Sequence, residues 1–165
     1  MKEYKVIDNF LPEDVFSEMS REITSPGKFP LYYVDFIAFS KERNKFFYFE
    51  HPLFYRSRPT SDFYLPIVEP FLEGIGINAI IRAKVNAYPK TESIEEHGKH
   101  VDFDNMPNDT AIFYINTNNG FTRLENGTVV ESVANRLLIL DGAIYHNSSS
   151  CTDADLRFVL NLNFI

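Results

Sequence analysis

The chain has 165 residues, a formal net charge of −7, and 44% apolar and 24% charged residues. This size and balance are typical of one globular domain with a single core, and the acidic charge disfavours nucleic acid as a partner. One cysteine excludes an internal disulfide, and the lack of an apolar leader or a membrane-length apolar run leads us to expect a cytoplasmic protein.

The first residues predict a strand followed by an amphipathic helix. Residues 4–7 read as a short strand. A proline and two acids at 12–14 suit the first turn of a helix, and Pro26 with Gly27 ends it. Four apolar residues at helical spacing are expected to face the core: Val15, Phe16, Met19 and Ile23.

The next segment predicts two aromatic strands, a loop and a second helix. The expected elements are strands at 31–38 and 45–49, a loop at 51–61 and a helix at 62–73. The loop is inferred from its two prolines. Pro66 and Pro70 oppose the helix because proline removes a backbone donor, and two glycines stop it.

From residue 77 onward, short strands and tight turns replace the helical pattern. Strands are expected at 80–88, 110–116, 121–124, 128–133, 137–140 and 157–164. Asn126-Gly127 is a strong hairpin signal. Many short strands at regular spacing favour a sandwich or barrel. We therefore expect a mainly β protein in one domain over 1–165, with helices and strands of 1–76 supporting a strand core at 77–165.

His100-Val101-Asp102 is the first stretch that indicates chemistry. In extended backbone the two outer side chains point the same way, because side chains alternate with a period of two. A second histidine from a distant strand, for which His146 is the candidate, completes a 2-His-1-carboxylate set that suits Fe(II) and leaves coordination positions open. Arg157 follows eleven residues later at the head of the last strand, and its guanidinium can grip a carboxylate in two places.

At these residues the sequence resembles the Fe(II)/2-oxoglutarate-dependent dioxygenases, and among them the prolyl-hydroxylase-like branch. The resemblance covers roughly residues 82–165. Its four pieces, in order, are Val85-Asn86-Ala87-Tyr88-Pro89, then His100-Val101-Asp102, then Phe113-Tyr114-Ile115-Asn116, then His146 with Arg157. The whole chain is also similar to short phage-encoded members, for which the host cytoplasm is the expected location.

The resemblance implies a double-stranded β-helix, or jelly roll, with the amino-terminal helices packed on one sheet. It also implies a catalytic Fe(II) held by His100, Asp102 and His146. The implied co-substrates are 2-oxoglutarate and O₂, with ascorbate as a candidate reductant. Asp102 favours hydroxylation, because halogenating relatives lack this carboxylate.

The same resemblance implies a pocket for 2-oxoglutarate. The basic residue that holds its distal carboxylate matches Arg157, and two family tyrosines match Tyr114 and Tyr88. Asn161 and Asn86 share faces with these residues and are weaker candidates for cofactor binding. The last strand alternates an apolar and a polar face. The polar face is either half-exposed or lines the cavity of the jelly roll.

Two further histidines are rivals for the metal. His97 has no acid two residues after it, and we interpret it as a residue at the rim of the site. His51 precedes a proline in the predicted loop and is interpreted as structural.

The implied activity is hydroxylation of a C–H bond coupled to conversion of 2-oxoglutarate to succinate and CO₂. We expect a peptidyl residue, proline first, as the substrate. The alternatives are a small molecule or free amino acid, or a non-catalytic metal-binding jelly roll. A nucleic-acid demethylase is disfavoured, because that branch carries a second arginine where this chain has Asn163. Specificity is expected in polar loops at 94–99 and 104–108.

Overall fold

Two antiparallel sheets and two helices make up the computed structural model, which describes residues 3–37 and 46–165. The elements are β1 (Tyr4–Ile7), α1 (Glu13–Thr24), β2 (Tyr32–Val34), β3 (Tyr48–Tyr55), β4 (Arg58–Pro59), α2 (Tyr64–Ile75), β5 (Ile80–Pro89), β6 (Asp109–Tyr114), β7 (Phe121–Leu124), β8 (Val129–Glu131), β9 (Arg136–Asp141), β10 (His146–Ser148) and β11 (Leu156–Phe164). Residues 38 and 45 of the predicted strands lie outside the described residues.

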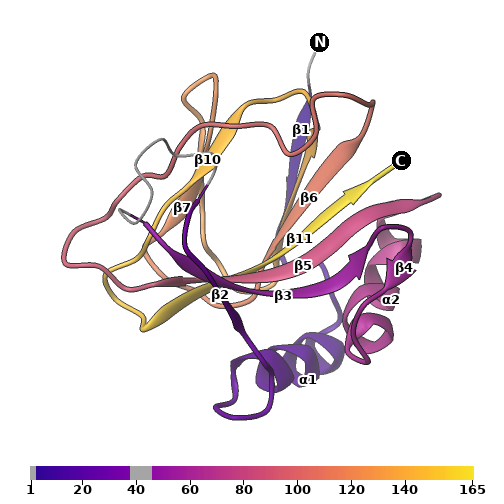
Figure 1. Ribbon diagram of the computed structural model, residues 1–165, viewed down its shortest axis with the longest axis horizontal. Helices are drawn as coiled ribbons and strands as arrows, with labels where there is room; N and C mark the ends of the chain where they lie inside the picture. Colours follow the sequence, from indigo (N-terminus) through magenta and orange to yellow (C-terminus); the bar gives the residue numbers. More distant parts are fainter. Residues whose placement is uncertain (1–2, 38–45) are drawn as a thin grey trace.

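The larger sheet runs in the order β1-β9-β6-β11-β5-β3-β2, with β4 paired to β3, and the smaller sheet runs β10-β7-β8. Both helices pack on one side of the larger sheet, and β7 and β10 lie over its other side (Figure 1). The mainly β jelly roll with supporting amino-terminal helices is therefore confirmed. No helix in the described ranges has the length and apolar character needed to cross a lipid bilayer.

The side chains of strand β11 alternate strictly between two buried regions, one on each side of the larger sheet. Four of its residues belong to the core between the sheet and the helices: Phe158, Leu160, Leu162 and Phe164. The opposite face points between the two sheets, and its residues Arg157, Val159, Asn161 and Asn163 are all buried. The polar face of the last strand therefore lines the interior of the jelly roll and is not half-exposed.

The predicted loop at 51–61 is wrong, because most of this segment forms β3 and β4. Pro52 is tolerated in β3 because the register against β5 shifts between Pro52 and Phe54. At such a bulge one residue makes no ladder hydrogen bond, so the N–H group that proline lacks is not needed. His51 is thus in a strand. Its ring is buried between the Pro30 carbonyl and the Ser61 hydroxyl, each 2.6 Å away, which agrees with a structural role.

Other elements follow the predicted pattern, although the strand expected at 31–38 is limited to Tyr32–Val34. The hairpin at Asn126-Gly127 joins β7 to β8, and Gly127 has the positive φ of 89° that such a turn demands. Helix α2 forms despite Pro70, because its apolar face packs into the core through Ile67, Val68 and Phe71. Strand β10 carried no sequence signal, since its three residues are polar.

Candidate functional site

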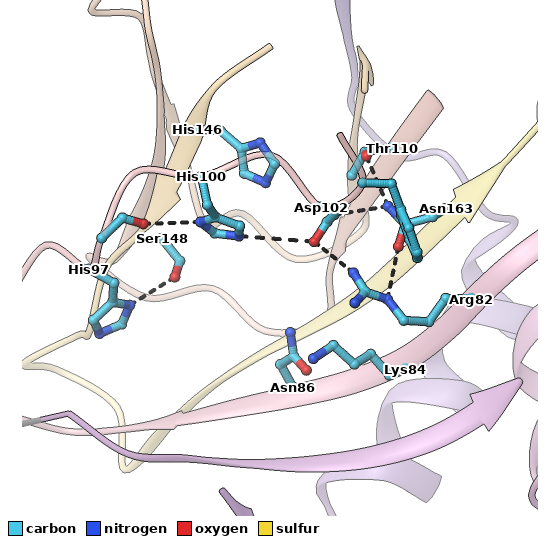
Figure 2. A network of polar contacts seen from close by, with 12 residues as sticks. Arg82, Lys84, Asn86, His97, His100, Asp102, Thr110, His146, Ser148 and Asn163 are labelled. Carbon is cyan, nitrogen blue, oxygen red and sulfur yellow. Dashed lines mark hydrogen bonds and ion pairs between the residues drawn. The ribbon is translucent and has the colours of Figure 1, made fainter. Parts of the chain in front are cut away.

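Three predicted metal ligands meet between the two sheets. The ligand atoms of His100, Asp102 and His146 all lie within 4.8 Å of one another. Backbone pairing brings the histidines together: the His100 amide donates to the His146 carbonyl and the His146 amide donates to the His100 carbonyl, both at 2.9 Å. A distant strand therefore supplies the second imidazole, as the resemblance implied (Figure 2).

The rings of both histidines are held with one nitrogen available. Nδ1 of His100 lies 3.0 Å from the Gly98 carbonyl, and Nδ1 of His146 lies 3.1 Å from the Ile144 carbonyl. A carbonyl can only accept, so each Nδ1 carries the proton and each Nε2 keeps a lone pair. Burial and the neighbouring His146 lower the pKa of His100, which keeps this imidazole neutral and able to bind a cation.

Asp102 is fixed by a network that the sequence did not reveal. Arg82 Nη2 donates to Oδ1 at 2.6 Å, and Asn163 Nδ2 donates to Oδ2 at 2.9 Å. Arg82 Nε also donates to the Asn163 side chain at 3.0 Å, and Asn163 Nδ2 lies 3.0 Å from the Thr110 hydroxyl (Figure 2). Burial alone would raise the pKa of Asp102, but the charge of Arg82 and these hydrogen bonds hold it well below its usual range. The carboxylate is therefore ionised and restricted in orientation.

Arg157 is a fully buried cation without a carboxylate partner in the described part of the chain. Nε donates to the Ser132 hydroxyl at 2.7 Å and Nη2 to the Thr122 hydroxyl at 3.3 Å, while Nη1 has no partner. The rings of Tyr88 and Tyr114 lie 5.5 and 5.6 Å from the guanidinium carbon. An uncompensated buried charge is costly, so this arrangement suits an anionic ligand that reaches Nη1.

The predicted co-substrate residues gather around the same interior. Tyr88, Asn161 and Arg157 line a cavity that also touches His100 and His146. The Oδ1 atoms of Asn161 and Asn86 are buried without a partner, although Asn86 Nδ2 donates to the Tyr88 hydroxyl at 3.2 Å. The unpaired donor on Arg157 and the unpaired acceptor on Asn161 belong to residues that line this cavity, and they fit a polar ligand. The cavity measures only about 20 Å³, so a five-carbon diacid requires side chains to shift on binding.

Two polar residues that contact Arg157, Thr122 and Ser132, were not predicted. The predicted Tyr114 is more deeply buried than Tyr88 and donates its hydroxyl proton to Thr122 at 2.9 Å, so Thr122 links this tyrosine to Arg157. Ser132 holds the arginine from the other side. A Cβ at Gly120 would lie 2.6 Å from Arg157 Cδ, so only glycine leaves enough space for the Arg157 side chain in this position. Thr122 lies on β7 and Ser132 directly follows β8, so the packing of the smaller sheet against the larger one brings them to Arg157 on β11.

His97 is not at the rim, which corrects the sequence-based interpretation. Its ring is buried, lies 5.2 Å from the Tyr88 ring, and places Nδ1 2.8 Å from the Ser148 hydroxyl. It packs behind the pocket tyrosine and is not part of the ligand set. Burial and the nearby charge of Arg157 lower the pKa of His97 from 6.5 to about 3.

Neutral burial of His97 predicts a pH-dependent stability. The unfolded chain binds a proton at this imidazole below pH 6.5 while the folded chain does not, so folding stability is lost as the pH falls from 6.5 toward 3. We expect the free energy of unfolding to decrease by up to about 1.4 kcal/mol per pH unit in this window from His97 alone. Urea denaturation of metal-free wild type and His97→Gln at several pH values tests this. Equal slopes for the two proteins would contradict it.

Comparison with known proteins places the fold. No protein-family model matches the sequence, and no curated protein matches it. A prolyl-4-hydroxylase from Pseudomonas putida is a structural neighbour with a TM-score of 0.62 and 19% identity, over 99% of this chain and 93% of that one.

Two further neighbours have the same fold. A prolyl hydroxylase from Trichoplax adhaerens, in complex with a hypoxia inducible factor oxygen degradation domain peptide fragment, gives a TM-score of 0.67 at 14% identity over 98% of this chain and 83% of that one. A 2OG-Fe(II) oxygenase family oxidoreductase from Burkholderia pseudomallei gives 0.69 at 12% identity over 98% and 84%. These likenesses establish the double-stranded β-helix.

Proposed function

We propose that this protein is an Fe(II)- and 2-oxoglutarate-dependent dioxygenase that hydroxylates a C–H bond. The observation that carries the proposal is the meeting of His100, Asp102 and His146 beside a small cavity. Both histidines line this cavity together with Arg157, whose buried Nη1 has no partner. Two imidazoles with a carboxylate suit ferrous iron, and the unpaired Nη1 of the guanidinium suits a dicarboxylate co-substrate. One solved neighbour of this fold is named as a member of the 2OG-Fe(II) oxygenase family, which is a name that states both the metal and the co-substrate.

The residues divide into two roles. His100, Asp102 and His146 would hold Fe(II), which with 2-oxoglutarate and O₂ supplies oxidative decarboxylation to succinate and CO₂ and transfer of one oxygen atom to the substrate. Arg157 anchors the distal carboxylate and so fixes how the keto acid points. Tyr88 covers that pocket, and burial around it excludes water from the reacting groups.

For the substrate, we propose a peptidyl residue, with proline as the first candidate, and so the prolyl-hydroxylase-like branch. Two observations support it. One neighbour of this fold is a prolyl hydroxylase in complex with a peptide. In this chain an open cleft of about 530 Å³, bordered by His100 and Asp102, lies beside the triad and has room for more than a single small metabolite.

A free amino acid or another small molecule is the second candidate. It is favoured by the charged side chains Glu50, Arg82 and Lys84 in the same cleft, which an uncharged prolyl segment would leave unused. Charged groups held inside a cleft favour ligands of complementary charge.

A substrate screen separates the two candidates. Purified protein with Fe(II), 2-oxoglutarate and O₂ is incubated with a library of proline-containing peptides and, separately, with a pool of free amino acids and metabolites. The expected result is a gain of one oxygen atom in a peptide, coupled to succinate release. Coupling only to a free metabolite would replace the peptide proposal with the second candidate.

A further inference from the structure

The floor of the open cleft carries three charged side chains, of which only Arg82 also contacts the metal triad. Strands β3 and β5 form this floor, and their side chains Glu50, Arg82 and Lys84 line it together with His100 and Asp102. Figure 2 shows Lys84 and Asn86 rising from β5 toward the space below the triad. The cleft and the small Arg157 cavity share His100, so an occupant of each would meet at the metal.

Lys84 is a largely buried cation with one donor to spare. Its Nζ donates to Glu50 Oε2 at 2.8 Å and to the Tyr48 hydroxyl at 2.9 Å. An ammonium has three protons, so one is not used by these contacts. Burial lowers the pKa of Lys84, while the adjacent Glu50 opposes that effect and favours the charged form.

Arg82 adds a second cation with an unused donor. Nη2 donates to Asp102 and Nε donates to Asn163, while Nη1 has no partner among the described residues. Arg82 and Lys84 are two residues apart on β5, so their side chains point to the same face of the sheet, and both line the cleft. Each cation is held by one carboxylate, Arg82 by Asp102 at 2.6 Å and Lys84 by Glu50 at 2.8 Å. Both heads are therefore fixed at the cleft, and each keeps a donor for a ligand.

We propose that the substrate binds this cleft through a carboxylate held between Lys84 Nζ and Arg82 Nη1. The proposal rests on the function proposed above and names the group by which that site recognises its substrate. Two cations on one strand that line the same cleft can each donate to a carboxylate, and partial burial strengthens both hydrogen bonds. The carboxylate belongs to a free amino acid or to an acidic group in a peptide. An interior prolyl segment without an acidic neighbour would bind weakly.

Matched ligand pairs test the proposal without turnover. The protein is loaded with Zn(II) and saturating 2-oxoglutarate, and binding is measured by calorimetry. The probes are a panel of N-acetyl amino acids, proline included, each paired with its amide, and a proline peptide carrying Glu beside the proline paired with its Gln version. We expect at least one acid to bind about ten-fold or more tightly than its amide, since a hydrogen bond to a charged group is lost.

The pair that shows the preference identifies the source of the carboxylate. A preference among the amino acids points to a free amino acid, and a preference for the Glu peptide points to an acidic peptide. No preference for an acid in any pair would overturn the proposal. Because no turnover is needed, this result stands apart from the proposed oxygenase activity, whose failure would appear as absent succinate with the carboxylate preference intact.

Two variants with different expected effects separate substrate recognition from a structural role of the ion pair. Lys84→Met removes the cation and keeps the length of the side chain, so the preference for acids is expected to fall about ten-fold. Glu50→Gln removes the negative charge beside Lys84 and is expected to leave the preference unchanged or increase it. Lys90→Met, an exposed lysine at the end of the same segment, serves as the control. Equal losses in Lys84→Met and Glu50→Gln would indicate a structural role and contradict the proposal.

Discussion

Replacing His146 with alanine is expected to abolish stoichiometric binding of Fe(II). Three protein ligands define the face that holds the metal, and removal of one leaves two. Loss of a partner that only orients a ligand already costs about 10–100-fold in metal affinity, so loss of a ligand itself should exceed 100-fold. The same result is expected for His100→Ala and Asp102→Ala. Metal content after anaerobic loading and gel filtration measures the effect.

A histidine outside the triad provides the matched control for that experiment. His97 is buried a few residues before His100, but it bonds to Ser148 and is not in the ligand set. His97→Gln is therefore expected to retain one Fe(II) per chain. Loss of metal in His97→Gln together with retention in His146→Ala would contradict the ligand assignment.

Arg157→Met is expected to weaken binding of 2-oxoglutarate while Fe(II) still binds. Truncating one partner of a desolvated, charge-assisted pair costs about 2–5 kcal/mol, which corresponds to roughly thirty-fold or more in Kd. Arg157→Lys keeps a charge but loses the fork, so an intermediate loss is expected. Tyr114→Phe removes only the hydroxyl that bonds to Thr122 and should have the mildest effect. Calorimetric titration of the metal-loaded proteins with 2-oxoglutarate gives the constants.

An exposed arginine on the smaller sheet serves as the control. Arg123 lies on β7 and pairs with Glu96 at 2.8 Å on the surface. Arg123→Met should bind 2-oxoglutarate as the wild type does. Wild-type affinity in Arg157→Met, or an equal loss in Arg123→Met, would show that the carboxylate is not held at the head of β11.

The family resemblance implied the whole candidate ligand set, and short-range geometry supports two parts of the site. Only one residue separates His100 from Asp102, and the alternation along β11 places Arg157 on the polar face. Neither inference needs knowledge of distant pairings. The hairpin at Asn126-Gly127 was predicted for the same reason, since turn chemistry is local.

The supporting residues could not be predicted because they depend on strand register. Asn163 reaches Asp102 through the alignment of β11 with β6, which sets Asn163 opposite Thr110, and with β5, which sets it opposite Arg82. Alternating polar residues on β5, at Arg82, Lys84 and Asn86, were the one available signal. A run of polar side chains on one face of a strand does not say whether that face meets water or a cavity.

Tertiary contacts also explain why the local setting of two histidines was predicted wrongly. The surrounding polar sequence favoured a rim position for His97, yet packing against Tyr88 buries its ring. Pro52 favoured a loop around His51, yet a bulge in β3 accommodates the proline and leaves the imidazole inside. In both places tertiary contacts outweigh the local preference.

The most direct test of the proposed activity is succinate formation from 2-oxoglutarate by the purified protein with Fe(II), with and without O₂. A dioxygenase forms succinate in wild type only when both Fe(II) and O₂ are present, even at the slow rate expected without substrate, and forms none in Asp102→Ala. A metal-binding jelly roll without catalysis gives the contrary result: one Fe(II) bound per chain, and no succinate above the Asp102→Ala background.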